Sequence, residues 1–168
     1  MNKHNGFTLV ELMVTLTVAA ILLTVGVPSM RDLILNNSLT ATTNMFTSSL
    51  NIARSEAIKQ GRTANLCVSD NQASCSGTNW RLGWLAWVDS NANGNLDAPG
   101  EIIRIVEPAP ATMTVTSAQA NFQIDAQGNV SNPNTTVTVC DNRAGETGRQ
   151  LRILATGGIS LNSQFGCI

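Results

Sequence analysis

The longest apolar stretch of the chain runs from Phe7 to Val27 and is followed by Pro28. Glu11 is the only charged residue among its 21 positions. At a rise of about 1.5 Å per residue, a helix of this length can cross a bilayer. The pattern predicts a membrane helix with one acid, and such an acid needs a partner, a proton or a position at headgroup depth.

Beyond Pro28 the pattern remains helical, since proline is tolerated in a membrane helix as a kink. An apolar stripe starts at Met30, Leu33 and Ile34 and recurs at Phe46, Leu50, Ala53 and Ala57. This spacing places the members of the stripe on one face of a helix. Because Gly61 is a favourable C-terminal stop, we expect one helix from about Phe7 to Gln60. Its second half would lie on a globular domain.

After Gly61 the pattern changes to short strands separated by Gly, Asn, Pro and Ser. The apolar or alternating runs are Ala64–Val68, Leu82–Val88, Ile102–Val106, Phe122–Ile124, Thr135–Val139, Leu151–Ala155 and Ile159–Leu161. A long helix followed by such strands predicts an α+β domain in which the helix packs on antiparallel sheet. Trp80, Trp84 and Trp87 could stack on bases, but their apolar surroundings favour core packing.

The residues around Glu11 indicate which kind of targeting segment this is. A secretory signal has its small-residue cleavage site after the apolar core, whereas Gly6 precedes the core here. Together Lys3, Gly6, Phe7, Glu11 and Pro28 resemble the class III signal of type IV pilins and pseudopilins. The resemblance implies that a prepilin peptidase cuts after Gly6 and N-methylates Phe7. It also implies that Glu11 meets the N-terminal ammonium of a neighbouring subunit during assembly.

The resemblance implies the type IV pilin fold and a division of the chain into four parts. These are a leader (1–6), a transmembrane and filament-core helix (7–28), an amphipathic continuation (29–61) and a β-rich globular head (62–168). Lys3 and His4 place the N-terminal side in the cytoplasm by the positive-inside rule. We therefore expect a single-pass inner-membrane protein with a periplasmic head, which later joins other pilin subunits in an extracellular pilus.

Four cysteines in a translocated domain predict disulfide bonds, because the compartment is oxidising. Three connectivities are possible. We favour Cys67–Cys75 and Cys140–Cys167, since each pair brackets a turn-rich stretch and the second would hold the C-terminus on a strand. Four zinc ligands are the less favoured alternative, because C-x-x-C spacing is missing from the sequence.

One loop invites comparison with a calcium site. Oxygen-bearing side chains recur at Asp89, Asn91, Asn93, Asp97 and Glu101. Gly94 lies where an EF-hand turns sharply, but Gly100 occupies the twelfth position and the flanking segments look like strands. A similar stretch is common in FimT/GspH-type minor pilins and pseudopilins. We therefore favour a hairpin connection, with bound calcium as the alternative, and we expect no cofactor.

The C-terminal region is basic although the net charge of the chain is −1. Two arginines stand against seven acids in residues 63–142, whereas Arg143, Arg149 and Arg152 stand against one acid in the residues that follow. Guanidinium forks suit phosphate oxygens, and Gly148 could let the backbone approach a phosphate closely.

The Gly148-Arg149 pair, followed by Arg152, resembles the C-terminal segment of FimT-type minor pilins, some of which bind DNA for natural transformation. The resemblance implies that Gly148, Arg149 and Arg152 contact double-stranded DNA, and Arg143 is a further candidate because it belongs to the same basic region. Arg149 and Arg152 would point to opposite faces of a regular strand, so a shared surface requires a loop or a bulge. The alternative is that these arginines are solvated and protect a sheet edge from aggregation.

The residue composition argues against an enzyme. His4, the only histidine, lies in the predicted leader, tyrosine is missing from the sequence and the cysteines are expected to be paired. The sequence predicts a minor pilin of a type IV pilus that takes part in DNA uptake. The alternatives are a pseudopilin of a type II secretion system and a structural subunit that primes pilus assembly.

Overall fold

The computed structural model describes residues 7–167 except 98, 144 and 146, so that the predicted leader lies outside the described residues. The chain divides into two compact units, Met1–Asn37 and Ser38–Ile168. One helix, α1 (Leu9–Gln60), runs through both units and includes Pro28. A long helix with an internal proline is therefore present, as the hydrophobic pattern predicts.

The N-terminal end of α1 is fixed by Thr8. The Thr8 hydroxyl accepts a hydrogen bond from the backbone N–H of Glu11 (3.2 Å). The Thr8 carbonyl accepts the first helical bond, from the N–H of Leu12 (3.1 Å). Thr8 is thus the N-cap, where a hydroxyl satisfies an N–H group that has no partner inside the helix. The helix was predicted to begin at about Phe7, and it begins at Leu9, after the Thr8 cap.

The C-terminal end of α1 is fixed by Gly61, as predicted. Gly61 has a φ of 62°, a left-handed conformation that glycine adopts without steric cost. Its N–H donates to the carbonyl of Ile58 (3.3 Å), and the N–H of Arg62 donates to the carbonyl of Ala57 (3.1 Å). This pair of bonds is a Schellman motif, which satisfies carbonyls that the helix leaves unpaired.

The second half of α1 buries one face. Fully buried side chains on this face are Leu39, Phe46, Leu50, Ala53 and Ala57, which include the last four members of the predicted stripe. The first three members of the stripe, Met30, Leu33 and Ile34, are 59%, 55% and 55% exposed. These three continue the first part of the helix, where apolar side chains occupy every face.

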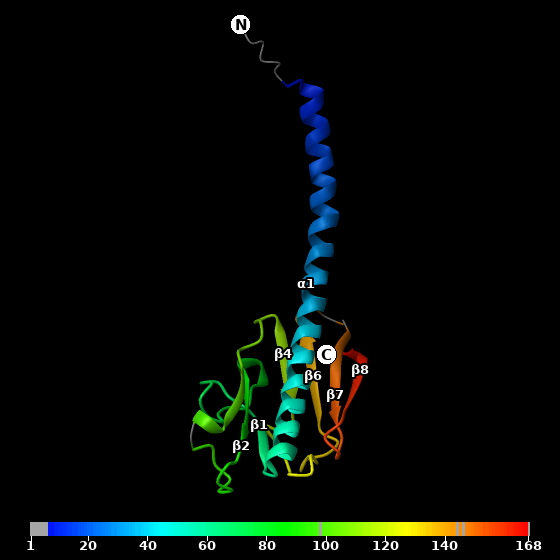
Figure 1. The fold of residues 1–168 in the computed structure, drawn as a ribbon. Coiled ribbons are helices and arrows are strands. Elements are labelled where there is room, and N and C mark those ends of the chain that lie inside the picture. The colour runs from blue at the N-terminus through cyan, green and yellow to red at the C-terminus, as the bar shows by residue number, and fades with distance from the viewer. Residues whose placement is uncertain (1–6, 98, 144, 146, 168) are drawn as a thin grey trace. The chain divides into compact units, whose positions relative to one another are not determined.

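Eight strands follow α1 in the described part of the chain (Figure 1). They are β1 (Ala64–Val68), β2 (Trp84–Val88), β3 (Ile102–Val106), β4 (Met113–Ser117), β5 (Asn121–Ile124), β6 (Thr136–Asp141), β7 (Thr147–Ile153) and β8 (Ile159–Gly166). Short 3-10 helices lie at Trp80–Leu82 and Pro99–Glu101. Seven strands correspond to predicted runs. Strand β4 was not predicted, although its first four residues alternate between buried and exposed in the sequence Met-Thr-Val-Thr-Ser.

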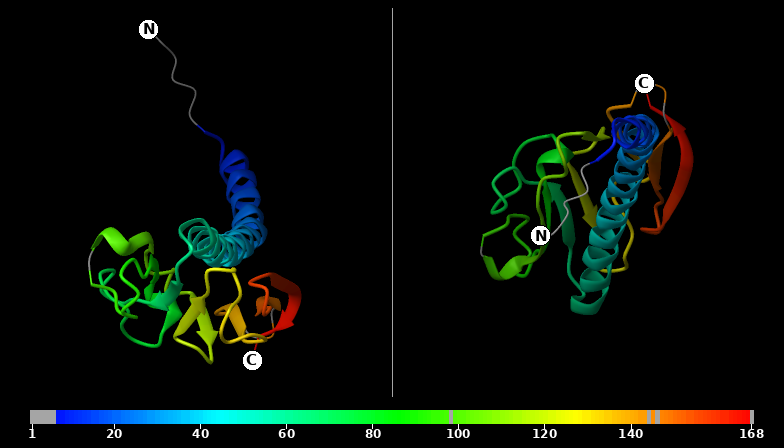
Figure 2. Two further views of the ribbon diagram at one scale, coloured as in Figure 1. Left: turned by 60° about the horizontal axis from the view of Figure 1, so that its bottom comes forward. Right: turned by 90° about the horizontal axis from the view of Figure 1, so that it is seen from above.

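The strands form two antiparallel sheets. Sheet A has the order β3-β2-β1-β5 and sheet B the order β4-β6-β7-β8. The second half of α1 lies across one face of both sheets (Figure 2). We call this the inner face of each sheet, and the opposite side the outer face. The predicted α+β arrangement, a long helix on antiparallel sheet, is confirmed.

The core between α1 and sheet A is aromatic. The ring of Phe46 lies 5.3 Å from Trp80, 5.8 Å from Trp84 and 6.0 Å from Phe122, measured between centroids. Trp84 Nε1 donates to the Ser49 hydroxyl (3.0 Å) and Trp80 Nε1 to a backbone carbonyl (2.8 Å). Both indoles are buried, with their polar groups satisfied as buried groups require. The prediction of core packing over a base-stacking platform is confirmed for these rings.

Candidate assembly segment and basic strand

The first part of α1 exposes apolar side chains on all of its faces. Phe7 is 78% exposed and Leu22 is 66% exposed, and the most apolar window of the helix has none of its residues buried. By length and composition, α1 is the one helix of the described chain that could cross a membrane. Phe7, the predicted mature N-terminus, is at the start of this segment. Gly6, the predicted cleavage-site residue, lies outside the described residues.

Glu11 is the third residue after the N-cap, so it lies in the first turn of α1. Positive charge accumulates at a helix N-terminus, because its N–H groups point outward without partners, and a carboxylate in the first turn is stabilised there. The pattern Thr-x-x-Glu at Thr8–Glu11 is that of a capping box. This sequence pattern could have identified the start of the helix. The Glu11 side chain is exposed.

The two arginines of β7 lie on opposite faces of sheet B. The pairing of β7 with β6 is regular from Arg149, opposite Val139, to Arg152, opposite Thr136. Side chains alternate along a regular strand, so Arg149 shares the inner face with the buried Leu151, and Arg152 points outward. A register shift does occur between Gly148 and Gln150, but only in the pairing with β8. The structure therefore does not join the two side chains on one surface.

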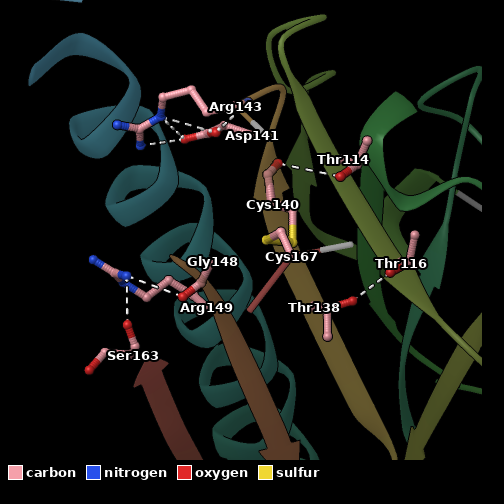
Figure 3. The surroundings of a disulfide bond; sticks show 10 residues. All are labelled: Thr114, Thr116, Thr138, Cys140, Asp141, Arg143, Gly148, Arg149, Ser163 and Cys167. Carbon is pink, nitrogen blue, oxygen red and sulfur yellow. Dashed lines mark hydrogen bonds and ion pairs between the residues drawn. A yellow bond between two sulfur atoms is a disulfide. The ribbon is translucent and has the colours of Figure 1, made fainter. Parts of the chain in front are cut away.

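Arg143 forms an ion pair with Asp141 (Figure 3). Arg143 Nη2 lies 2.6 Å from Asp141 Oδ2, and Arg143 Nε donates to both carboxylate oxygens. The two side chains are only 15% and 2% exposed. Burial acts to raise the pKa of Asp141, but the Arg143 hydrogen bonds and charge outweigh it and hold the pKa below its usual range. The positive charge of Arg143 is thus largely balanced by Asp141 within the head.

Gly148 lies against the disulfide Cys140–Cys167. A Cβ atom on Gly148 would come within 2.4 Å of Cys167 Sγ and 2.6 Å of the Val139 carbonyl oxygen. Residue 148 therefore has no space for a side chain. Gly148 was predicted to let the backbone approach a phosphate, but its surroundings give it a packing role, because the disulfide crosses the outer face of β7 at this point.

The structure contains both disulfides in the favoured pairing, Cys67–Cys75 and Cys140–Cys167. The first closes the loop after β1, and the second joins β6 to the end of β8. At the same end of sheet B, Arg149 Nη1 donates to the carbonyls of Gly148 (3.2 Å) and Ser163 (2.9 Å; Figure 3). Arg149 therefore supports the end of sheet B as well as carrying charge.

The loop from Asp89 to Glu101 joins the adjacent antiparallel strands β2 and β3, which is a hairpin connection. Its carboxylates accept hydrogen bonds from the loop itself. Asp89 accepts from the N–H groups of Asn93 and Gly94, and Glu101 accepts from Ser90 and from the N–H of Asp97. Asp97 accepts from the side-chain amides of Asn91 and Asn93.

These hydrogen bonds lower the pKa of Asp97, with the Asn91 amide contributing most, and that of Glu101, with the Ser90 hydroxyl contributing most. Within the described residues, no group of three or more His, Cys, Asp or Glu side chains could hold a metal ion. The geometry matches the predicted structural turn, in which Asn and Asp side chains bond the local backbone.

Two family models match the chain. The prokaryotic N-terminal methylation motif covers residues 1–27, and the type II transport protein GspH covers residues 42–157. Since the second model matches more than half of the chain, the protein belongs to the GspH family. Pilin and pseudopilin families of this kind consist of structural proteins. The resemblance found in the sequence is thereby confirmed at the level of the family.

Two solved structures share the fold, and both are crystal forms of the type IV minor pilin FimU of Pseudomonas aeruginosa PAO1. The P21 form is 23% identical with a TM-score of 0.60, and the match covers 79% of this chain and 94% of the crystallised FimU chain. The P65 form is 22% identical with a TM-score of 0.54, and covers 76% and 96%. The predicted type IV pilin fold is confirmed. A comparison with curated protein sequences gave no match.

Proposed function

We propose that the protein is a minor pilin of a type IV pilus. Prepilin peptidase would cut after Gly6, the first half of α1 would hold the protein in the inner membrane, and the protein would then enter a filament with its head exposed. The observation that carries this proposal is the change along α1 from apolar on every face to buried on one face. A helix that is apolar all round requires surroundings without water, namely lipid before assembly and neighbouring helices after it.

Glu11 provides the direct test of assembly. In the proposal its carboxylate pairs with the N-terminal ammonium of an adjacent subunit, which offsets the cost of an acid in an apolar environment. Glu11→Ala should lower the amount of protein in sheared filaments about tenfold at an unchanged membrane level, whereas the control Leu12→Ala should not. Incorporation of Glu11→Ala at the parental level would contradict the pairing.

A pseudopilin of a type II secretion system is the alternative, and the description of the matching GspH family supports it. A deletion strain separates the two functions. Loss of surface pili with normal export of secreted enzymes supports the pilus, and the opposite result supports secretion. Loss of neither, with the protein present in filaments, would assign it a dispensable structural role.

A second proposal is that the head contacts double-stranded DNA during uptake. It rests on the exposure of Arg152 and on the lack of any acid in the sequences of β7 and β8. Arg143 pairs with Asp141 and Arg149 occupies the other face, so we assign the main phosphate contact to Arg152. A single arginine–phosphate contact gives one head a low affinity for DNA, and several heads displayed together would raise the affinity.

Titration of the head, from Pro28 onwards, with labelled duplex DNA tests this assignment. The logarithm of affinity falls with the logarithm of salt concentration by about 0.9 per phosphate contacted. A slope near −0.9 fits Arg152 alone, and about −2.7 would fit the surface of three arginines that the sequence predicts. Arg152→Gln should abolish binding, with Arg62→Gln as a control. Failure of the parent head to bind at low salt would refute the proposal.

A further inference from the structure

Strand β8 is an open edge of sheet B. It has β7 as its neighbour in the sheet order, and residues 160–164 are all exposed in the described structure. Its sequence, Ile-Ser-Leu-Asn-Ser-Gln-Phe-Gly, contains neither a charge nor a proline. Natural sheets normally protect such an edge with charges, proline or a covering segment, because exposed backbone groups recruit another strand. An edge of this length and composition is suited to a partner strand.

The backbone groups that face away from β7 can be assigned from the turn between the two strands. The N–H of Leu154 donates to the carbonyl of Gly158 (2.8 Å). Hydrogen-bonded and non-hydrogen-bonded pairs alternate along antiparallel strands. Ser160 and Asn162 therefore direct their backbone groups toward β7, and Ile159 and Leu161 direct theirs outward. The Leu161 side chain, opposite the buried Leu151, is 53% exposed, and an added strand would cover it.

The open edge is held in position before any partner arrives. The disulfide Cys140–Cys167 ties the end of β8 to β6 and crosses β7 at Gly148, which has no side chain to obstruct it. Arg149 Nη1 donates to the Ser163 carbonyl, so the edge with available backbone groups is limited to the first half of β8. A fixed strand loses less conformational entropy on binding than a mobile one, which favours strand addition here.

We propose that an extended segment of a neighbouring filament subunit adds to Ile159–Asn162 as a further strand of sheet B. This inference rests on the proposed filament function. Arg152 lies opposite Ser160 on the outer face, and a residue of the added strand opposite Ser160 would lie about 10 Å from the Arg152 Cα, two strand spacings away. That separation is within reach of an arginine and an acidic side chain together. Because β7 and β8 contain no acid that could pair with Arg152, the partner segment that fits this edge carries an acid opposite Ser160.

Photo-crosslinking in cells, with the full-length chain, tests this proposal. A photoreactive benzoylphenylalanine replaces Asn162, and the same group at the exposed Gln127, in the turn after β5, is the positional control. Leu161→Pro removes the outward N–H without removing a bond to β7, a position at which edge strands accept proline. The matched variant Leu161→Ala shortens the side chain and retains the N–H. Thermal unfolding and non-reducing gels verify that both variants fold with their disulfides.

The expected result is an adduct at position 162, located by mass spectrometry in an extended segment of another pilin subunit. Leu161→Pro should reduce its yield roughly fivefold and Leu161→Ala less than twofold. A yield no higher than at Gln127, insensitivity to Leu161→Pro, or an adduct only with a second copy of this chain would overturn the proposal. Sheared filaments from the same cells distinguish the failures. Protein present in filaments with no adduct refutes strand addition alone, and protein missing from filaments refutes the proposed function.

Discussion

The two sheets of the head differ in how they are covered. Every residue of β1 and β2 in sheet A is buried, on both faces. Sheet A packs on α1 through its inner face, and Leu96 and Ile102 pack on its outer cluster of Cys67, Leu85 and Trp87. In sheet B, by contrast, burial alternates along β6, and the outer residues of β4 are exposed.

This difference in burial suggests that sheet A stabilises the fold and that sheet B provides surface for partners. A strand buried on both faces is apolar at consecutive positions, as in the Trp-Leu-Ala-Trp-Val sequence of β2, and it leaves no surface for a partner. A strand buried on one face alternates, and its outer side chains remain available. The arginine proposed to contact DNA and the edge proposed to bind a strand both belong to sheet B. Substitutions in sheet A should therefore affect stability, and those on the outer face of sheet B should affect contacts.

The largest expected effect is on the aromatic core of sheet A. Trp84→Ala should lower the free energy of unfolding of the head by about 3–5 kcal/mol, because it leaves a cavity beside Phe46 and removes the hydrogen bond that the Ser49 hydroxyl accepts from the indole. Trp84→Phe, which retains a ring, should cost less. Urea unfolding measures both. A loss below about 1 kcal/mol for Trp84→Ala would contradict the view of sheet A as the structural half.

The next largest loss of stability is expected for Gly148→Ala, which tests the packing of the disulfide in sheet B. Its Cβ would overlap Cys167 Sγ and the Val139 carbonyl, so we expect a loss of about 2–3 kcal/mol. In a Cys140→Ala/Cys167→Ala background the sulfur atoms are gone, and the same substitution should cost less. Thermal or urea unfolding of the four proteins gives the coupling. Equal costs in the two backgrounds would show that the disulfide is not what requires glycine.

Arg143→Gln should destabilise the head by about 2 kcal/mol, because it leaves the nearly buried Asp141 carboxylate without its guanidinium partner. The double variant Asp141→Asn/Arg143→Gln should be less destabilised, since no charge is left buried. Urea unfolding of the single and double variants provides the measurement. If Arg143→Gln instead left stability unchanged and weakened DNA binding, the structural role assigned to Arg143 would be wrong.

The same ion pair predicts a dependence on pH. The pKa of Asp141 is lower in the folded protein than the ordinary value of about 4, so its stabilising contribution is complete above that value. The contribution is lost as the pH falls through the folded-state pKa. The difference in unfolding free energy between the parent and Arg143→Gln should therefore shrink below about pH 4. A difference that is constant from pH 7 to pH 3 would contradict this.

The smallest effect is expected on the outer face of sheet B. Thr116 is exposed there, Thr138 is half-buried, and the two share a hydrogen bond between their hydroxyls. Thr116→Val should change the free energy of unfolding by no more than about 0.5 kcal/mol, because water can replace the lost partner. Urea unfolding beside Trp84→Ala gives the contrast between the sheets directly. A cost comparable to that of Trp84→Ala would show that this face is covered in the folded head.

Local pattern was sufficient to predict the helix and all strands except β4. The apolar run from Phe7, the stripe from Phe46 to Ala57 and the stop at Gly61 depend on neighbours along the chain, and each was predicted. The pairing of Cys140 with Cys167 followed from turn-rich spacing. The missed strand, β4, is an exposed edge with only two buried side chains, so its apolar pattern is weak.

The sequence by itself determined that a membrane-length helix with one acid precedes a disulfide-bonded β head. Only the tertiary structure decided the roles of the C-terminal residues. Three arginines near each other in sequence become an ion pair with Asp141, a support for the end of β8 and an outward-facing charge. Gly148 leaves room for the disulfide Cys140–Cys167 because it has no side chain. These outcomes depend on which strands lie side by side and which face each residue occupies, and such long-range geometry is not encoded in spacing along the chain.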